Sequence, residues 1–260
     1  MSTVNWIETN LQDGVLRIEF NRPRVNALSL DMVVQLQAAF KQAERDVQVR
    51  CVLLTAQGST FSAGQDLSEM QTKAGISFRE HLLKTYNPLI LQIRRLEKPV
   101  LAAIQGAVAG AGLGLALACD LRIASREARF LVGFAGIGLA PDSAVSLLLP
   151  QLIGLGRASE AAFINALIDA DQALAWGLVN RVVSRDELNP TATEWATQLA
   201  SGPVHAMGLA KRDFNKAILP NLEAVLDYEA HNQEIAGKGI EHQEGLRAFL
   251  EKRAPDYLHH

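Results

Sequence analysis

Short apolar segments alternate with amphipathic helical segments along the first part of this 260-residue chain, and this alternation constrains the fold more than any other feature. Two strand-like segments, 6–10 and 15–20, flank a turn at residues 12–14 and indicate a hairpin. Ser29 then stands where a helix over residues 30–46 needs its N-cap. Further strand-like segments are residues 51–56, 100–104, 120–125 and 128–132, and further helical segments are residues 77–96 and 113–119. A ββα unit thus repeats about three times, and the apolar strands predict an α/β fold whose sheet is buried on both faces.

The second part of the chain has a different pattern. Strand signals fade after Gly156, apart from residues 178–183, and amphipathic helices follow one another from Asn189 onward. No linker rich in Pro, Gly or Ser separates the two parts. We therefore expect an α/β core at residues 1–188 and a C-terminal helical region at residues 189–260, which packs on the core or on a neighbouring subunit.

Composition favours small-molecule chemistry in a cytoplasmic protein. The net charge of −3 provides no basic field for nucleic acid or an anionic membrane surface. The N-terminus lacks the features of a signal peptide, and glycines interrupt the apolar stretch at residues 100–119, so no membrane span is expected. Cys51 and Cys119 lie in apolar runs typical of buried, reduced thiols. The terminal His259 and His260 resemble the remnant of a purification tag.

Asp142 is the single ionisable residue in the apolar run from Phe130 to Gly156. A carboxylate among Leu, Ile, Phe and Val is poorly solvated, so its pKa should rise toward the range useful for proton transfer. Asp142 also follows Pro141 and precedes a helical segment, where an N-cap aspartate is common. The run by itself leaves both roles open.

Two glycine-bearing turns, residues 61–67 and 106–114, come directly after strand-like segments. Small residues there leave backbone N–H groups free to approach a ligand, and the second turn runs into the positive end of a helix. Together they can form an oxyanion hole. Dinucleotide binding fits less well, because Leu115 occupies the last small position of that fingerprint and residues 110–117 contain no phosphate-binding Lys. Close packing of a helix on the sheet also explains the glycines.

Five segments carry a resemblance to a known family: FNRPRVNALS, FSAGQDL, KPVLAAIQGAVAGAGLGLALACDLRIAS, ARFLVGFAGIGLAPDS and GLRAFLEKRAPDY. The chain resembles the enoyl-CoA hydratase/isomerase family, the crotonase superfamily, over nearly its whole length. This resemblance implies the ClpP/crotonase-like spiral of ββα units with C-terminal helices. It implies that the Gln65 and Ala111 N–H groups form the oxyanion hole. The implied substrate is an acyl-CoA thioester, and the implied residues of its site are Ser62, Ala63, Gly64, Gln65, Asp66, Leu67, Gly110, Ala111, Phe134, Leu139 and Lys252.

The resemblance is most informative where it breaks. Family members that hydrate enoyl-CoA carry two glutamates, and here their positions hold Gly114 and Phe134, neither of which transfers a proton. The segment GLAPDS instead resembles the branch that contains the ring-epoxide isomerase of phenylacetate catabolism and is related to Δ3,Δ2-enoyl-CoA isomerases. That resemblance places Asp142 in the acyl pocket as a single acid/base.

The expected activity is therefore an acyl-CoA isomerisation, either of 1,2-epoxyphenylacetyl-CoA to an oxepin-CoA or of a Δ3 to a Δ2 double bond. Enoyl-CoA hydration is an alternative. A protein that binds CoA thioesters without turnover is a second alternative. The resemblance also implies a homotrimer or a dimer of trimers.

No cofactor is expected, because coenzyme A is part of the substrate. No metal is expected, since the histidines have no metal-ligand spacing. Asp66 and Asp120 are interpreted as turn and capping residues. Asn26 resembles part of the family's early Asn-Ala-Leu turn, which implies that it is structural or lies near the coenzyme. Lys252 and Arg253 suit a solvated helix end, although in the family this region reaches coenzyme A phosphates.

Overall fold

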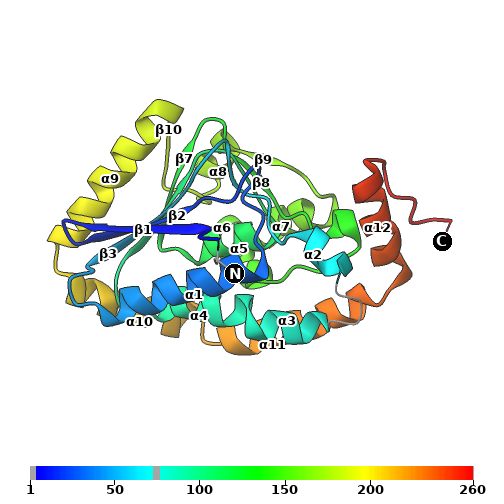
Figure 1. The fold of residues 1–260 in the computed structure, drawn as a ribbon, viewed down its shortest axis with the longest axis horizontal. Helices are drawn as coiled ribbons and strands as arrows, with labels where there is room; N and C mark the ends of the chain where they lie inside the picture. The colour runs from blue at the N-terminus through cyan, green and yellow to red at the C-terminus, as the bar shows by residue number, and fades with distance from the viewer. Residues whose placement is uncertain (1–3, 73–76, 260) are drawn as a thin grey trace.

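A six-stranded sheet is the centre of the fold (Figure 1), in a computed structural model that describes residues 4–72 and 77–259. Its strands, in spatial order, are β1 (Ile7–Gln12), β2 (Val15–Phe20), β3 (Cys51–Ala56), β5 (Val100–Ile104), β7 (Leu121–Ser125) and β10 (Arg181–Val183). β1 and β2 form the predicted antiparallel hairpin, and all later neighbours are parallel. The predicted α/β fold is confirmed.

A second sheet of four short strands was not predicted. Its order is β4 (Thr60–Ser62), β6 (Ala107–Ala109), β8 (Arg129–Leu131) and β9 (Ile168–Asp169). Parts of both glycine-bearing segments, predicted as turns throughout, are therefore strands. β8 lies within the predicted strand segment at residues 128–132. β4, β6 and β9 were not predicted, because strands of two or three residues are too short to show an alternating hydrophobic pattern.

Helices cover both faces of the large sheet, as the apolar strands indicated. In β3, Cys51 and Leu53 pack with residues of α9 (Arg185–Ser201), whereas Val52 and Leu54 belong to the main core. That core includes the buried face of α1 (Leu30–Arg45), whose N-terminus is capped by Ser29 as predicted. Neighbouring residues in a strand point to opposite faces of the sheet. The apolar strand β3 therefore packs against the main core on one face and against α9 on the other.

The helix predicted over residues 77–96 is two helices, α3 (Phe78–Lys84) and α4 (Tyr86–Arg95), which meet at Thr85. Pro88 explains the break, because it has no N–H to donate to the carbonyl of residue 84 and its ring crowds that carbonyl. The side chain of Gln37 instead donates to the carbonyl oxygens of Lys84 and Thr85, at 3.2 and 2.7 Å. The break leaves Tyr86 buried at the start of α4.

The remaining helices lie around the second sheet and at the C-terminus (Figure 1). They are α2 (Leu67–Thr72), α5 (Gly110–Ala118), the 3-10 turn η1 (Ala135–Ile137), α6 (Val145–Ile153), α7 (Leu155–Phe163), α8 (Ala170–Ala175), α10 (Val204–Ile218), α11 (Leu222–Gly237) and α12 (Ile240–Glu251). α9 begins at Arg185 and packs on the large sheet, whereas α11 contacts α3 and α6, and α12 contacts η1. The division of the chain at residue 188 stays a prediction.

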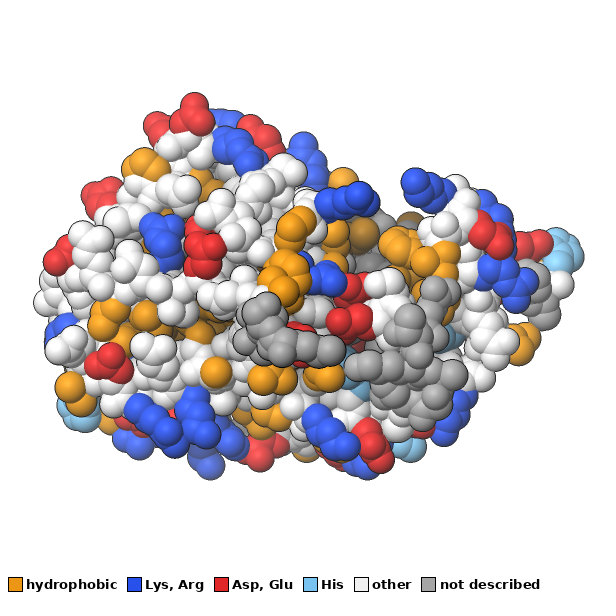
Figure 2. Space-filling model, in the orientation of Figure 1, with side chains coloured by type: hydrophobic (Ala, Val, Ile, Leu, Met, Phe, Trp, Pro, Cys, Tyr) orange, Lys and Arg blue, Asp and Glu red, His pale blue; other side chains and the backbone are white. Residues whose placement is uncertain are grey.

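The surface carries charges of both signs in mixture, and Figure 2 shows hydrophobic side chains beside the notch that separates α12 from the body of the molecule. No helix in the described part of the chain combines the length and the apolarity needed to span a bilayer. His260 lies outside the described residues.

Candidate active site

The two glycine-bearing segments touch each other through Gly64 and Gly110, which have φ angles of +84° and +54°. A Cβ on Gly64 would lie 2.8 Å from the carbonyl oxygen of Ala109 and 3.4 Å from the amide nitrogen of Ala111. Residue 64 must therefore be glycine for both conformational and steric reasons. This contact brings the two predicted oxyanion-hole residues, Gln65 and Ala111, to the same place.

Both predicted donors have backbone N–H groups that secondary structure leaves open. Gln65 forms a parallel bridge with Leu28, which donates to the Gly64 carbonyl at 2.7 Å and accepts from the Asp66 amide at 3.0 Å. These bonds flank Gln65, so its own N–H points away from Leu28. Ala111 is the second residue of α5, where an N–H has no acceptor within its helix. Neither N–H group is therefore used by the secondary structure around it, and their joint role as an oxyanion hole stays a prediction.

Asp142 is buried, with 7% of its surface exposed. The Ser143 hydroxyl donates to its Oδ1 at 2.7 Å, and Nε2 of Gln233 donates to its Oδ2, also at 2.7 Å. Burial raises the pKa of Asp142 to about 6, against the lowering effect of these two hydrogen bonds. A group with such a pKa exchanges protons readily near neutral pH.

Asp142 does not cap the following helix. α6 begins at Val145, after Ser143 and Ala144 with φ angles of 56° and 62°. The Asp142 carboxylate accepts from the Ser143 hydroxyl and the Gln233 amide, and no side chain caps the first turn of α6 from its N-cap position. The capping interpretation of Asp142 is therefore wrong. Successive non-glycine residues in this left-handed region are strained, and such strain clusters at functional sites.

Glu229 of α11 takes the capping role instead. Its carboxylate accepts hydrogen bonds from the Ala144 N–H at 2.8 Å, from the Ser146 N–H at 3.0 Å and from the Ser146 hydroxyl. Burial raises the pKa of Glu229 to about 7. Glu229 and Gln233 share one face of α11, four residues apart, and sequence reasoning missed both. Nothing in an amphipathic helix pattern distinguishes them from other polar residues.

Gly114 and Phe134, the positions where the resemblance expects the glutamates of hydratases, have no side chain that can transfer a proton. A Cβ on Gly114 would lie 2.5 Å from both the Cβ and the carbonyl oxygen of Ser143. Phe134 is 6% exposed at the start of η1, and the predicted pocket residue Leu139 donates its N–H to the Phe134 carbonyl at 3.0 Å. Gly114 therefore brings no side chain to the residue next to Asp142, and the place of Phe134 and Leu139 in an acyl pocket stays a prediction.

The side chain of Gln65 connects to two residues to which sequence reasoning gave no role. Its Oε1 accepts from the Tyr86 hydroxyl at 2.5 Å and lies 3.0 Å from Nε2 of His81. Burial, and then the charge of Asp142, raises the pKa of Tyr86 well above its ordinary value. The broken helix α3–α4 thus brings a phenol and an imidazole to the predicted oxyanion hole.

Ser62 supports the first turn from beneath. Its hydroxyl donates to the Asn26 carbonyl at 2.8 Å and accepts from the Gly64 N–H at 3.2 Å, while Asn26 itself donates to the carbonyls of Gln57 and Thr60. Asn26 thus has a structural role in this turn, and whether it also lies near coenzyme A stays a prediction. Ala63 is exposed beside this turn. Contact of Ser62 and Ala63 with coenzyme A stays a prediction.

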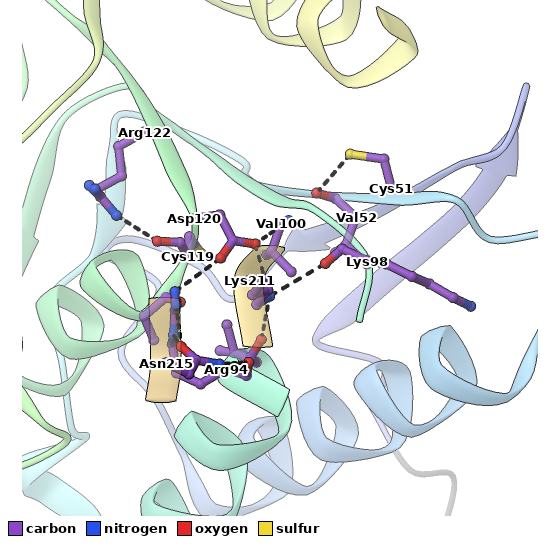
Figure 3. A network of polar contacts seen from close by, with 12 residues as sticks. Cys51, Val52, Arg94, Lys98, Val100, Cys119, Asp120, Arg122, Lys211 and Asn215 are labelled. Atoms are coloured by element: carbon purple, nitrogen blue, oxygen red, sulfur yellow. Dashed lines mark hydrogen bonds and ion pairs between the residues drawn. The ribbon is translucent and has the colours of Figure 1, made fainter. Parts of the chain in front are cut away.

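The two aspartates interpreted as turn residues have that role and form ion pairs as well. Asp66 accepts from the Ser68 N–H at 3.0 Å at the start of α2 and lies 2.5 Å from Arg22. Asp120 accepts from the Val100 N–H at 2.9 Å and pairs with Arg94 at 3.0 Å and Lys211 at 2.8 Å. Figure 3 shows this second network, which ties α4, α10 and the large sheet together.

Lys252 ends α12 with a φ of 55° and is exposed, so its predicted contact with coenzyme A stays untested. Its neighbour Arg253 pairs with Glu244 at 2.5 Å. Within residues 4–72 and 77–259, His, Cys, Asp and Glu side chains form no group of three that could hold a metal ion.

Known proteins are similar to this chain in sequence and in fold over nearly its whole length. Residues 10–260 match the family described as enoyl-CoA hydratase/isomerase. The chain is 38% identical to the 1,2-epoxyphenylacetyl-CoA isomerase of Escherichia coli strain K12, over 98% of each chain. It is also 38% identical to the 4-chlorobenzoyl coenzyme A dehalogenase-2 of an Arthrobacter species, over 92% of this chain and 88% of that one. The structure of an enoyl-CoA hydratase from Mycobacterium avium subsp. paratuberculosis K-10 superposes with a TM-score of 0.90 at 33% identity, over 98% of this chain and 99% of that one.

Proposed function

Because the chain belongs to the enoyl-CoA hydratase/isomerase family and has the crotonase fold, we propose that it isomerises an acyl-CoA thioester with Asp142 as the single acid/base. One observation carries this proposal. Asp142 is a buried carboxylate whose pKa is raised to about 6, and Gly114 and Phe134 stand where hydratases of the family carry their glutamates.

Steric contacts argue further against hydration. Ser143 fills the space next to Gly114 so closely that a glutamate there requires the backbone after Asp142 to move. The structure therefore favours one acid over two. Hydration remains the alternative activity, because the names of relatives include hydratases.

The mechanism follows from the two turns and the acid. The thioester oxygen accepts hydrogen bonds from the Gln65 and Ala111 N–H groups, which stabilise the enolate-like charge that forms when a neighbouring carbon loses its proton. Asp142 takes that proton and returns it to the carbon two positions away, so the double bond moves from the 3- to the 2-position and no atom is gained or lost. Loss of one oxyanion-hole donor typically costs about 100- to 1,000-fold in rate.

Two substrate classes are compatible with this oxyanion hole and single acid. With a ring epoxide, the hole polarises the thioester and Asp142 assists a rearrangement in which the bond between the two epoxide carbons breaks and the six-membered ring expands to an oxepin, so that no atom is gained or lost. The Escherichia coli relative is named for 1,2-epoxyphenylacetyl-CoA, which supports the ring epoxide and a place in phenylacetate catabolism. A linear 3-enoyl-CoA, as in fatty acid metabolism, is the other class. Lys252 and the turn at residues 62–67 are proposed to bind coenzyme A in both cases. That the protein is a homotrimer, and that it is located in the cytoplasm, stay predictions.

Replacing Asp142 with Asn tests the proposal, with exposed Asp213→Asn as the matched control. Conversion of 3-enoyl-CoA to 2-enoyl-CoA, followed by ultraviolet absorbance, should fall at least about 100-fold in the first variant, because proton transfer typically contributes about 100- to 10,000-fold. It should not change in the second. Activity near the parent level in Asp142→Asn would remove Asp142 from the mechanism.

Other substrates separate the alternatives. Rapid formation of 3-hydroxyacyl-CoA from 2-enoyl-CoA would support the hydratase. Chloride release from 4-chlorobenzoyl-CoA would assign the activity named for the Arthrobacter relative. Calorimetric binding of acyl-CoA without turnover of any of these substrates would support a thioester-binding protein.

A further inference from the structure

Gln233 lies 91 positions beyond Asp142 in the chain, yet its side chain is buried against that carboxylate. It is 1% exposed, and its Nε2 donates to Asp142 Oδ2 at 2.7 Å. Ser143 donates to the other carboxylate oxygen. Each carboxylate oxygen of Asp142 therefore accepts one hydrogen bond, Oδ1 from Ser143 and Oδ2 from Gln233.

The amide of Gln233 is satisfied at one end only. Its Oε1 is buried and has no hydrogen-bond partner in the part of the chain that the structure describes. A buried polar atom without a partner is unfavourable, so this side chain is not explained by stability alone. Turning the amide by half a rotation would place its carbonyl against a carboxylate, with two acceptors in contact. The observed orientation thus favours the ionised form of Asp142.

The other groups around Asp142 do not stabilise its ionised form. Glu229, one turn before Gln233 on α11, is a second buried acid, and its charge opposes that of Asp142. Tyr86 of α4 is a buried phenol that donates its hydroxyl to Gln65. Gly114 of α5 brings only backbone to Ser143. In these surroundings, Ser143 and Gln233 are the two groups that favour the carboxylate over the acid.

We propose that Gln233 is a positioning residue that holds Asp142 in the orientation and ionised state in which it accepts a proton from the acyl-CoA substrate. The importance of this positioning for catalysis rests on the proposed isomerase function. Gln233 acts through Asp142 and does not itself transfer a proton, because a neutral amide neither gains nor loses one in this range. α11, a helix of the C-terminal part of the chain, thereby contributes through Asp142 to the proposed proton transfer.

The first experiment compares Gln233→Leu with the parent protein, and Gln198→Leu serves as an exposed control for the same change. With 3-enoyl-CoA, kcat should fall about 10-fold while KM changes less than about twofold. The midpoint of the rising limb of kcat/KM against pH should move up by about one pH unit, the size expected for one lost hydrogen bond to a charged group. Below about pH 4, where Asp142 is protonated in both proteins, the melting temperature should stay the same or rise, because the unpartnered carbonyl is removed. At pH 8 it should fall, because the buried carboxylate has lost a hydrogen bond. Gln198→Leu should match the parent in every measurement.

Gln233→Met gives a second apolar variant with a flexible side chain, and the same shift is expected in it. An unchanged pH midpoint in both variants would overturn the proposal. So would a loss of activity that is matched by a loss of melting temperature without any movement of the midpoint, since a merely structural role predicts that result.

A measurement without substrate separates this proposal from the proposed function. The carboxyl carbon of Asp142 can be titrated by NMR in the substrate-free protein labelled with ¹³C-aspartate, and Asp142→Asn identifies its signal. Gln233→Leu should move its midpoint upward even if the parent isomerises no enoyl-CoA. Equal midpoints in parent and variant would contradict the positioning role, whatever the enzyme's reaction proves to be.

Discussion

Gly114 and Ser143 are in contact at a distance that only glycine permits, since a Cβ at position 114 would lie 2.5 Å from the Ser143 carbonyl oxygen. The contact packs α5, which carries Ala111, against the segment that carries Asp142. It also supports the left-handed conformations of Ser143 and Ala144. One glycine thus fixes the acid relative to the predicted oxyanion hole.

Gly114→Ala should therefore destabilise the protein by about 1 to 3 kcal/mol, the usual cost of overpacking. It should also lower activity, because Ser143 has to move and Asp142 moves with it. Gly156→Ala is the matched control, since nothing lies within 4 Å of its Cβ position in α7. There Ala should raise stability by up to about 1 kcal/mol through its better helix propensity. Urea unfolding and the isomerase assay measure both effects, and equal stability losses in the two variants would contradict the steric argument.

Gly64→Ala should reduce kcat about 100- to 1,000-fold by displacing the Gln65 N–H, which is the range for a lost oxyanion-hole donor. Its Cβ would lie 2.8 Å from the Ala109 carbonyl oxygen. Gly58 provides a close control, because it also has a positive φ of 78° and nothing lies within 4 Å of its Cβ position. Gly58→Ala should cost roughly 1 to 2 kcal/mol of stability through backbone strain and leave kcat unchanged. If both variants lose activity equally, strain rather than the contact between the turns is responsible.

Stability should depend on pH through Asp142. Its pKa is raised from 3.8 to about 6 in the folded protein, so the charged form is disfavoured by folding. The associated stability is present below about pH 4 and is lost as the pH rises through about 6. Asp142→Asn does not ionise, so it should be more stable than the parent at pH 8 by an amount on the order of 2 kcal/mol. That advantage should vanish at pH 4.

Urea unfolding of Asp142→Asn, Asp213→Asn and the parent at both pH values checks this prediction. Asp213 is exposed, so its variant should follow the parent throughout. If the free energy of unfolding of Asp142→Asn at pH 8 is no larger than that of the parent, burial does not disfavour the charged form of Asp142.

Much of the fold could be predicted because long apolar strands and capped helices carry local signals. The hairpin β1–β2, the strand β3 and the Ser29-capped helix α1 are all present as predicted. Of the second sheet, only β8 lies in a predicted strand segment. β4 and β6 were missed, since such short strands are held by their neighbours more than by their own residues. The break at Thr85 was missed although Pro88 is visible in the sequence.

The candidate site shows the same division. The sequence by itself determined the chemistry available, because an isolated Asp142, two glycine-bearing turns and the absence of acids at positions 114 and 134 can all be read along the chain. Only the tertiary structure decided what Asp142 does. Glu229 accepts hydrogen bonds at the N-terminus of α6, and Gln233 donates a hydrogen bond to the Asp142 carboxylate. Both residues belong to α11, more than eighty positions further along the chain. Burial and hydrogen bonds between distant segments set the state of a carboxylate, and they exist only once the chain has folded.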